Sequence, residues 1–338
     1  MVIHGDDFLV EGKKNDLDWL GISIRRKYDV KVKVVGLGDG EVEEVMILNR
    51  VLRRTHEGYE LEADPRLAEV IIGEMGVESA NGADVPGIKD TKPLDCTEEP
   101  LTNTERTRYR SIAARVNYLS IDRSDLQFAA KEVCRVMSSP GRADWVKLKR
   151  IARYLRKRPR LITYYAWQDE PVDIRVYTDS DWAGCIRTRK STSGGIVMRG
   201  AHFLRSWSKT QNTIALSSGE AELQAVVKAA SEAVGIKSIA RDLGDSIVGN
   251  VKVYADASVA LGMVNRLGVG KVRHLDTRML WVQQSVAKHG VEYTKILGTE
   301  NPADALTKYV PWPGIQQLLQ CSSMAWQVGR PSVAPRAA

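Results

Sequence analysis

Two near-copies of one short segment end in aspartate, and carboxylates in such positions can bind metal ions. The segments are Arg175–Asp179 and Lys252–Asp256, which share the pattern basic-Val-Tyr-x-Asp. If both are parallel neighbouring strands, their carboxylates emerge at the same edge of one sheet. Two further acids, Glu222 and Asp304, stand near the starts of expected helices. Four carboxylates in such positions can hold two divalent metal ions, an arrangement that hydrolyses phosphodiesters.

The chemistry of phosphodiester hydrolysis explains why this set of acids predicts metal. The reaction needs an activated water and a stabilised leaving oxygen, and two Mg²⁺ ions about 4 Å apart supply both. Carboxylate oxygens are the ligands that Mg²⁺ prefers, and Mn²⁺ is an alternative ion for the same ligands. Crowded acids repel one another and raise their own pKa values unless a cation is bound.

Three other acids compete for these roles. Glu220 stands three residues after Ser217, so its simplest role is to close a capping box at a helix start. We expect the strand to end near Thr178, which places Asp181 in the following loop. Asp276 precedes another expected helix, where capping is a more common role than catalysis. We therefore assign the metal to Asp179, Glu222, Asp256 and Asp304.

Composition sets broad limits on the class of protein. The 338 residues allow two or three domains, and 43% of them are hydrophobic and 27% charged, as in globular proteins. The net charge of +7 permits a polyanionic partner without requiring one. The four cysteines form no C-x-x-C pair, which indicates neither a zinc site nor a disulfide framework. No apolar run reaches the length of a membrane-spanning helix, and Asp6 and Asp7 argue against a signal peptide.

The hydrophobic periodicity predicts the elements that must position the acids. Residues 1–10 indicate a hairpin with His4-Gly5-Asp6-Asp7 at its turn. Apolar residues at helical spacing predict helices over 65–75, 109–119, 126–136 and 143–157, and residues 80–107 read as a polar loop. Beyond residue 161 we expect strands at 174–178, 195–198, 203–207, 251–255 and 291–296, with helices beginning at Ser217, near 259, near 281 and at Asp304. This order predicts a mixed α/β fold: a five-stranded mixed sheet with flanking helices.

The predicted helix over 143–157 is strongly basic. Lys149, Arg153 and Arg156 are three of its cations, and its apolar residues form a single stripe. The cations either track the phosphates of a nucleic acid or form a solvated helix face. The sequence leaves both roles open.

From Tyr177 onward the chain resembles the RNase H domain of copia-type LTR retrotransposon Pol polyproteins. The matching blocks occur in family order: Tyr177 to Gly184, Thr188 to Gly194, Ser206 to Lys209, Ser217 to Leu223, Tyr254 to Asp256, and Ala303 to Lys308. The resemblance implies an RNase H-like sheet in which Asp179, Glu222, Asp256 and Asp304 are the metal-binding acids. Three positions depart from the family pattern: Gly219 replaces the usual Ala, Ala257-Ser258 replaces Asn-Gln, and the loop 297–300 lacks a histidine.

The resemblance extends upstream. His4-Gly5-Asp6-Asp7 is similar to the Tyr-Val-Asp-Asp box of the reverse transcriptase palm, and this resemblance implies that Asp6 and Asp7 descend from polymerase ligands. We expect the fingers and the rest of the palm to lie before Met1, in the parent element, so that this chain alone is not competent to polymerise. The predicted division is a truncated palm and thumb remnant over 1–90, a linker and helical connection region over 91–165, an RNase H-like domain over 166–312 and a C-terminal tail over 313–338.

The carboxylates predict two-metal phosphodiester hydrolysis, and the resemblance implies an endoribonuclease of a retroelement that cuts the RNA strand of RNA–DNA hybrids with two Mg²⁺ ions. Arg189, Lys190 and Lys209, with the basic helix, would hold phosphates. The main alternative is an inert retrotransposon remnant that at most binds nucleic acid. Integrase-like strand transfer is disfavoured by the capped helix of Glu222 and by the fourth acid. No membrane or small-molecule cofactor is expected, and the place of action is cytoplasmic, in a virus-like particle, or nuclear.

Overall fold

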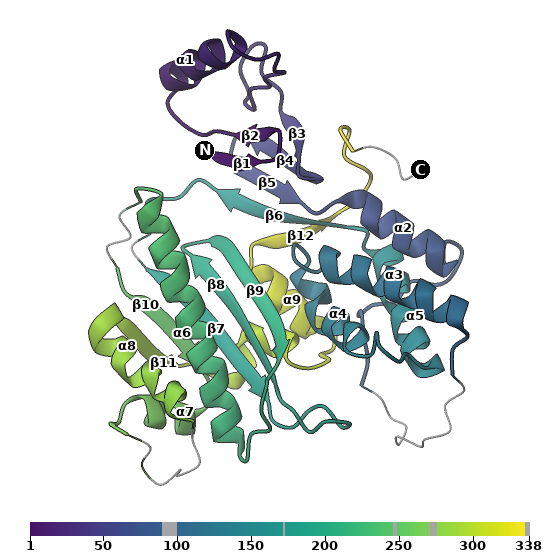
Figure 1. Cartoon of the computed structure of the whole chain (residues 1–338), viewed down its shortest axis with the longest axis vertical. Helices are drawn as coiled ribbons and strands as arrows, with labels where there is room; N and C mark the ends of the chain where they lie inside the picture. The colour runs from purple at the N-terminus through teal and green to yellow at the C-terminus, as the bar shows by residue number, and fades with distance from the viewer. Residues whose placement is uncertain (90–99, 172, 246–248, 269, 271–275, 335–338) are drawn as a thin grey trace.

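The computed structural model describes residues 1–89, 100–171, 173–245, 249–268, 270 and 276–334, and its centre is a five-stranded mixed sheet (Figure 1). The strand order is β11-β10-β7-β8-β9, and β10 runs parallel to both β7 and β11. β8 runs antiparallel to β7 and β9. The predicted mixed α/β fold is confirmed. The strands are β7 (Ile174–Asp181), β8 (Thr192–Arg199), β9 (His202–Thr210), β10 (Val251–Ala255) and β11 (Val291–Lys295).

Helices cover both faces of this mixed sheet because its strands alternate apolar side chains between the two faces. Val197 packs in a core with α6 (Ser218–Asp242), α7 (Ser258–Val264) and α8 (Trp281–His289). Its neighbours Ile196 and Met198 point the other way, into a core with the 3₁₀ helix η4 (Pro302–Leu306) and with α9 (Trp312–Cys321). The sheet is therefore buried on both sides, and its functional side chains must lie at an edge.

A second, antiparallel sheet joins segments that are distant in sequence. Its order is β12-β6-β5-β4-β3, and β6 pairs with β5 on one side and with β12 on the other. A buried ion pair links two of these strands, with Arg160 Nε and Nη2 donating to the Glu62 carboxylate at 2.6 and 2.7 Å. The strands are β3 (Glu44–Ile47), β4 (Arg50–Thr55), β5 (Gly58–Glu62), β6 (Arg160–Ala166) and β12 (Met324–Gln327).

The predicted four-part division of the chain remains a prediction. β5, β6 and β12, which pair in this antiparallel sheet, begin in three of the four predicted parts. Residues 91–99 of the predicted linker lie outside the described residues. Among the described helices, none has the length and apolar character needed to cross a membrane.

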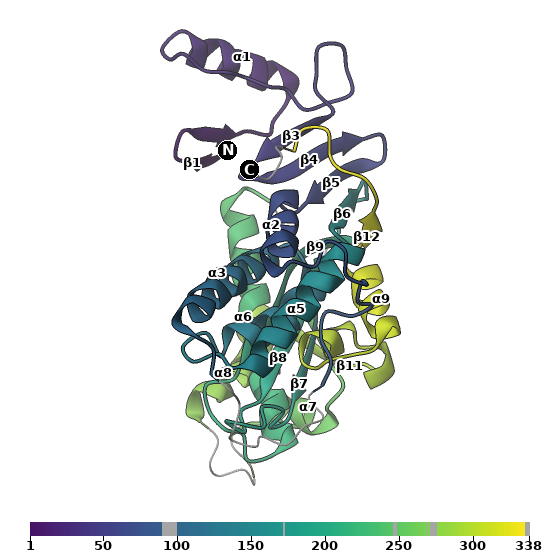
Figure 2. The same cartoon turned by 90° about the vertical axis from the view of Figure 1, so that its right-hand side faces the viewer.

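A cluster of helices packs beside the two sheets, as Figure 2 shows. Its apolar core contains the predicted stripe residues, among them Ile112, Val116, Leu148 and Ile151. The short 3₁₀ helix η1 (Ser124–Leu126) leads into one of these helices. The helices are α2 (Pro65–Met75), α3 (Asn103–Leu119), α4 (Gln127–Cys134) and α5 (Arg142–Lys157).

The N-terminal hairpin and the first helix extend away from the mixed sheet in both views (Figures 1 and 2). β1 (Val2–His4) pairs antiparallel with β2 (Asp7–Leu9), which confirms the predicted hairpin. Asp6 and Asp7 are both exposed on it. α1 (Lys14–Arg25) has no buried residue. Asp6 and Asp7 thus lie apart from the acids of the mixed sheet.

Candidate metal centre

Two parallel strands place Asp179 and Asp256 side by side. β7 and β10 are in register with Tyr177 beside Tyr254, and the two rings stack with their centroids 5.1 Å apart. Each aspartate follows its tyrosine by two residues, so both carboxylates leave the sheet at the same edge. The expectation of parallel neighbouring strands is confirmed.

One boundary in our prediction was wrong. β7 does not stop near Thr178 but continues to Asp181, because Asp179, Ser180 and Asp181 pair with Gly194, Ser193 and Thr192 of β8. Ser and Asp are weak strand formers, and the cross-strand partners override that local preference. Asp181 is therefore a strand residue, and its carboxylate accepts a hydrogen bond from the Thr192 backbone N–H.

The helix α6 brings the third carboxylate to this edge. Ser217 caps it, with its Oγ accepting from the Glu220 N–H at 3.2 Å, as predicted. The prediction of a capping box is correct for Ser217 but not for Glu220. Glu220 Oε2 accepts a hydrogen bond from Leu216 N–H at 2.8 Å, not from the Ser217 N–H that a capping box requires. Glu222, two residues further on, is 8% exposed and reaches back to the sheet.

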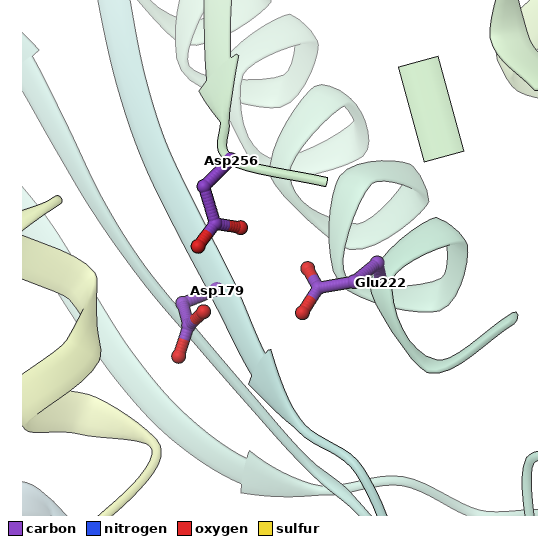
Figure 3. Close-up of side chains that lie close together, drawn as sticks. All are labelled: Asp179, Glu222 and Asp256. Carbon is purple, nitrogen blue, oxygen red and sulfur yellow. The ribbon is translucent and has the colours of Figure 1, made fainter. Parts of the chain in front are cut away.

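Glu222 meets the two aspartates in one cluster. Oxygen atoms of Asp179, Glu222 and Asp256 all lie within 4.8 Å of one another. Figure 3 shows them converging from two neighbouring strands and the facing helix. Ser180 holds Glu222 in place, since its N–H and its Oγ both donate to Glu222 Oε1 at 3.3 Å.

Burial and mutual repulsion raise the pKa values of these carboxyl groups. Burial raises the pKa of Asp179 to about 7, and the charges of Asp304 and Asp256 raise it too, against the hydroxyl of Thr307 and the ammonium of Lys308. Burial, followed by the charges of Asp179 and Asp256, raises the pKa of Glu222 to about 9. Burial and Asp304 also raise the pKa of Asp256. A bound cation would reverse these shifts, because it stabilises the ionised form of each group.

The donor atoms fit a hard divalent cation. Glu222 Oε2 is buried, and no described residue donates a hydrogen bond to it. A buried carboxylate oxygen without a partner is costly, and a metal ion is one group that would satisfy it. Three carboxylates that converge on one point are the ligand type of Mg²⁺ and Mn²⁺.

Asp304 lies next to this cluster but is not part of it. The predicted helix start is the five-residue 3₁₀ helix η4, which Asn301 caps by accepting from Ala303 N–H at 3.1 Å. The Asp304 carboxylate pairs with Lys308 Nζ at 2.8 Å. Its charge nevertheless raises the pKa values of both Asp179 and Asp256, which places it close to them. A fourth ligand from Asp304 stays a prediction that requires its ion pair with Lys308 to open.

Three residues that we did not predict support the carboxylates. Thr307 Oγ1 donates a short hydrogen bond to Asp179 Oδ2, and Ser180 holds Glu222 as described. Lys308 neutralises part of the negative charge. Thr307 and Lys308 stand three and four residues after the predicted Asp304, and the capped turn of η4 was the signal that could have identified them.

The predicted phosphate-binding residues fall into two groups. Arg189 and Lys209 are exposed and Lys190 is half-buried, and all three lie near the end of β7 that carries Asp179. In α5, Lys149 is exposed, whereas Arg156 Nε donates to Glu78 O at 2.6 Å and Arg153 Nε to Asn81 O at 2.7 Å.

The contacts of α5 give Arg153 and Arg156 a structural role. Both guanidinium groups hold the segment that follows α2, although each keeps further N–H donors. Their binding of phosphate, and that of Lys149, stays a prediction.

A glycine at the start of α6 accommodates a side chain of α7. A Cβ on Gly219 would lie 2.6 Å from Val259 Cγ1, so the two positions are coupled. We expect Gly219→Ala alone to lower the free energy of unfolding by about 1 kcal/mol, because overpacking outweighs the gain in helix propensity.

The matched experiment is a double-mutant cycle on this pair. In the background of Val259→Ala, Gly219→Ala should instead raise the free energy of unfolding by up to about 1 kcal/mol. Urea unfolding of the four proteins measures both effects. If the two substitutions are simply additive, Val259 does not explain the glycine.

Comparison with known proteins finds relatives by sequence. No protein-family model matches the chain. It is 28% identical over 317 residues to the retrovirus-related Pol polyprotein from transposon TNT 1-94 of Nicotiana tabacum, covering 92% of this chain and 23% of that protein. The chain is 29% identical over 203 residues to the retrovirus-related Pol polyprotein from transposon RE2 of Arabidopsis thaliana. That alignment covers 60% of this chain and 14% of that protein. An uncharacterized mitochondrial protein of Arabidopsis thaliana is 28% identical over 235 residues, and the alignment covers 69% of this chain and 92% of that protein.

Solved structures give weaker likenesses. RNase H1 from Halobacterium salinarum matches at 14% identity with a TM-score of 0.31, covering 40% of this chain and 94% of that one. The foamy viral protease-reverse transcriptase in complex with RNA/DNA hybrid matches at 10% identity with a TM-score of 0.39, covering 75% of this chain and 29% of that one. The present chain spans less than a quarter of the length of the two transposon polyproteins.

Proposed function

We propose that this chain, which is similar in sequence to retrovirus-related Pol polyproteins of transposons, is an RNase H-type endonuclease that cleaves the RNA strand of RNA–DNA hybrids. One observation carries the proposal: β7, α6 and β10 bring three carboxylates within 4.8 Å of one another, with raised pKa values. Outside a metal site such a cluster only destabilises the fold.

Each side chain of the site has a distinct task in this proposal. Asp179, Glu222 and Asp256 would hold two Mg²⁺ ions, with Asp304 as a fourth ligand and Mn²⁺ as the alternative metal. When bound, the ions supply an activated water and stabilise the leaving oxygen. Thr307 fixes the Asp179 carboxylate and Ser180 fixes Glu222, so that both ligands are preorganised.

The surrounding cations would bind the substrate backbone. We propose that Arg189, Lys190 and Lys209 contact phosphates near the carboxylates, and that Lys149, Arg153 and Arg156 of α5 extend the contact. In the parent polyprotein this activity would act on hybrids made by reverse transcription, in a cytoplasmic virus-like particle or in the nucleus. We infer no polymerisation by this chain alone, because Asp6 and Asp7 lie on an exposed hairpin and, within the described part of the chain, no third acid, histidine or cysteine joins them in a possible metal site.

The experiment is cleavage of a labelled RNA–DNA hybrid by the purified chain. We expect cleavage of the RNA strand with Mg²⁺ or Mn²⁺, none after chelation with EDTA, and none of a DNA duplex of the same sequence. Absence of hybrid cleavage with both metals, by a chain that is folded and binds the hybrid, would favour the alternative of an inert remnant.

A further inference from the structure

Exposed apolar side chains surround the carboxylate edge of the mixed sheet. Trp182 and Ile186 lie in the loop after β7 and are 54% and 53% exposed. Ile214 and Leu216 precede α6 at 52% and 65%, and Val259, in the first turn of α7, is 60% exposed. The loop with Trp182 and Ile186 comes after Asp179 in the sequence. The segment with Ile214 and Leu216 comes before Glu222, and Val259 comes after Asp256. The apolar rim, as we call these five side chains, thus borders the proposed metal centre on three elements.

Trp182 is held in position at this rim. Its indole Nε1–H donates to Ala215 O at 3.1 Å, which joins the loop after β7 to the segment before α6. The ring is nevertheless more than half exposed, and no described aromatic ring or cation stacks on it. A fixed but uncovered indole is a large apolar surface that loses little conformational entropy when it is covered.

The charges beside the rim identify what covers it. The same loop carries Arg187, Arg189 and Lys190, and a tight turn holds them, with Arg189 N–H donating to Cys185 O at 2.7 Å. Residues 182–191 of this loop contain no acid, and Asp181, the last residue of β7, accepts a hydrogen bond from Thr192 N–H. An apolar rim with cations along one side complements a polyanion with exposed sugar faces, whereas an apolar protein surface would leave those cations without partners.

From this juxtaposition we propose that the apolar rim, with Trp182 as its main contact, recognises the shape of a nucleic-acid groove. It packs on sugar faces in the wide, shallow minor groove of an RNA–DNA hybrid. An A-like helix presents such a groove, and the narrow minor groove of B-form DNA, about 6 Å wide, does not admit a flat indole surface. The proposal rests on the proposed function, because it names the feature by which that site selects its substrate. Trp182 is a specificity residue and touches no metal.

The test is binding without cleavage, measured in EDTA so that it does not depend on activity. We expect Trp182→Ala to weaken binding of a hybrid duplex about 10- to 30-fold, the loss typical of a truncated aromatic hot spot. Binding of a DNA duplex of the same sequence should weaken less than about 3-fold. The slope of log K against log[salt] should not change, because no charge is removed. Arg189→Ala should weaken both duplexes alike and reduce that slope.

Two controls separate groove reading from loop positioning. Trp182→Phe keeps an aromatic surface and loses the bond to Ala215, so it should retain most of the hybrid preference. Trp19→Ala removes an indole that is 68% exposed on α1 and should change neither duplex. The proposal is overturned if Trp182→Ala leaves the affinity for the hybrid unchanged or lowers the affinities for hybrid and DNA duplex equally. It is also overturned if Trp182→Phe lowers the affinity for the hybrid as much as Trp182→Ala does. If the chain binds hybrids selectively but does not cleave them, the proposed nuclease function is wrong and the proposed role of the apolar rim still holds.

Discussion

Asp179→Asn is expected to reduce Mg²⁺-dependent hybrid cleavage by at least about 10³-fold while the chain stays folded. Metal ions stabilise the transition state by several kcal/mol, and each 1.36 kcal/mol is a factor of ten in rate. Asp179 is 4% exposed at the centre of the carboxylate cluster, and the asparagine amide cannot supply its charge. The Thr307 hydroxyl can still donate to the amide oxygen, so the local hydrogen bond survives.

The thermal midpoint of the same variant distinguishes a metal ligand from a structural acid. Without metal, Asp179→Asn relieves the repulsion that raises the pKa of Glu222, so the midpoint of the variant should equal or exceed that of the parent. Addition of Mg²⁺ should raise the midpoint of the parent and much less that of the variant. Cleavage rates and melting curves with and without Mg²⁺ provide both measurements.

Two neighbouring acids serve as matched controls. Glu220→Gln keeps an oxygen that can accept from Leu216 N–H, and Asp181→Asn keeps one that can accept from Thr192 N–H. Both should retain cleavage within about tenfold, since neither carboxylate belongs to the metal cluster. If either control is as damaging as Asp179→Asn, the metal ligands are assigned to the wrong acids.

Local patterns were enough to predict the mixed sheet and the convergence of three of the four predicted acids. The repeated Val-Tyr-x-Asp segments became parallel neighbours in register, and the capped start of α6 delivered Glu222. Alternating apolar residues in β8 placed α6 on one face of the sheet and α9 on the other. These features depend on residues within one element or on the pairing of two similar strands.

The features that we missed depend on contacts between distant segments. The bonds from Arg153 and Arg156 in α5 to carbonyls after α2 join residues more than 70 positions apart, and nothing in the helix pattern indicates them. The pairing of β12 with β6 likewise joins segments about half the chain apart. Asp304 was predicted by position, but its ion pair with Lys308 depends on how η4 turns.

The second large effect concerns stability and pH. Without metal, the free energy of unfolding should fall by several kcal/mol between about pH 5 and pH 9, and Glu222→Gln should remove the largest single share of that fall. The pKa of Glu222 is raised from 4.5 to about 9 in the folded chain, because the side chain is buried beside Asp179 and Asp256. Each pH unit in that window is worth about 1.36 kcal/mol for one fully coupled group.

The sign follows from which state holds the proton. Below about pH 4.5 the Glu222 carboxyl group is protonated in both the folded and the unfolded chain, so it does not lower the free energy of unfolding there. Between that value and about pH 9 the folded chain keeps a proton that the unfolded chain has released, so every rise in pH favours unfolding. Above about pH 9 both states are ionised, and the contribution of this group becomes constant.

Mg²⁺ should cancel this loss, because a cation at the cluster stabilises the ionised carboxylates of the folded chain only. Urea unfolding at pH 5.5, 7 and 8.5, with and without Mg²⁺, measures the effect. Subtracting the Glu222→Gln values removes the titrating groups that do not interact with Glu222. We expect the difference between variant and parent to grow with pH in EDTA and to shrink or reverse in Mg²⁺. A difference that is independent of pH would mean that Glu222 is ionised without metal, and the argument from repulsion to a metal site would then fail.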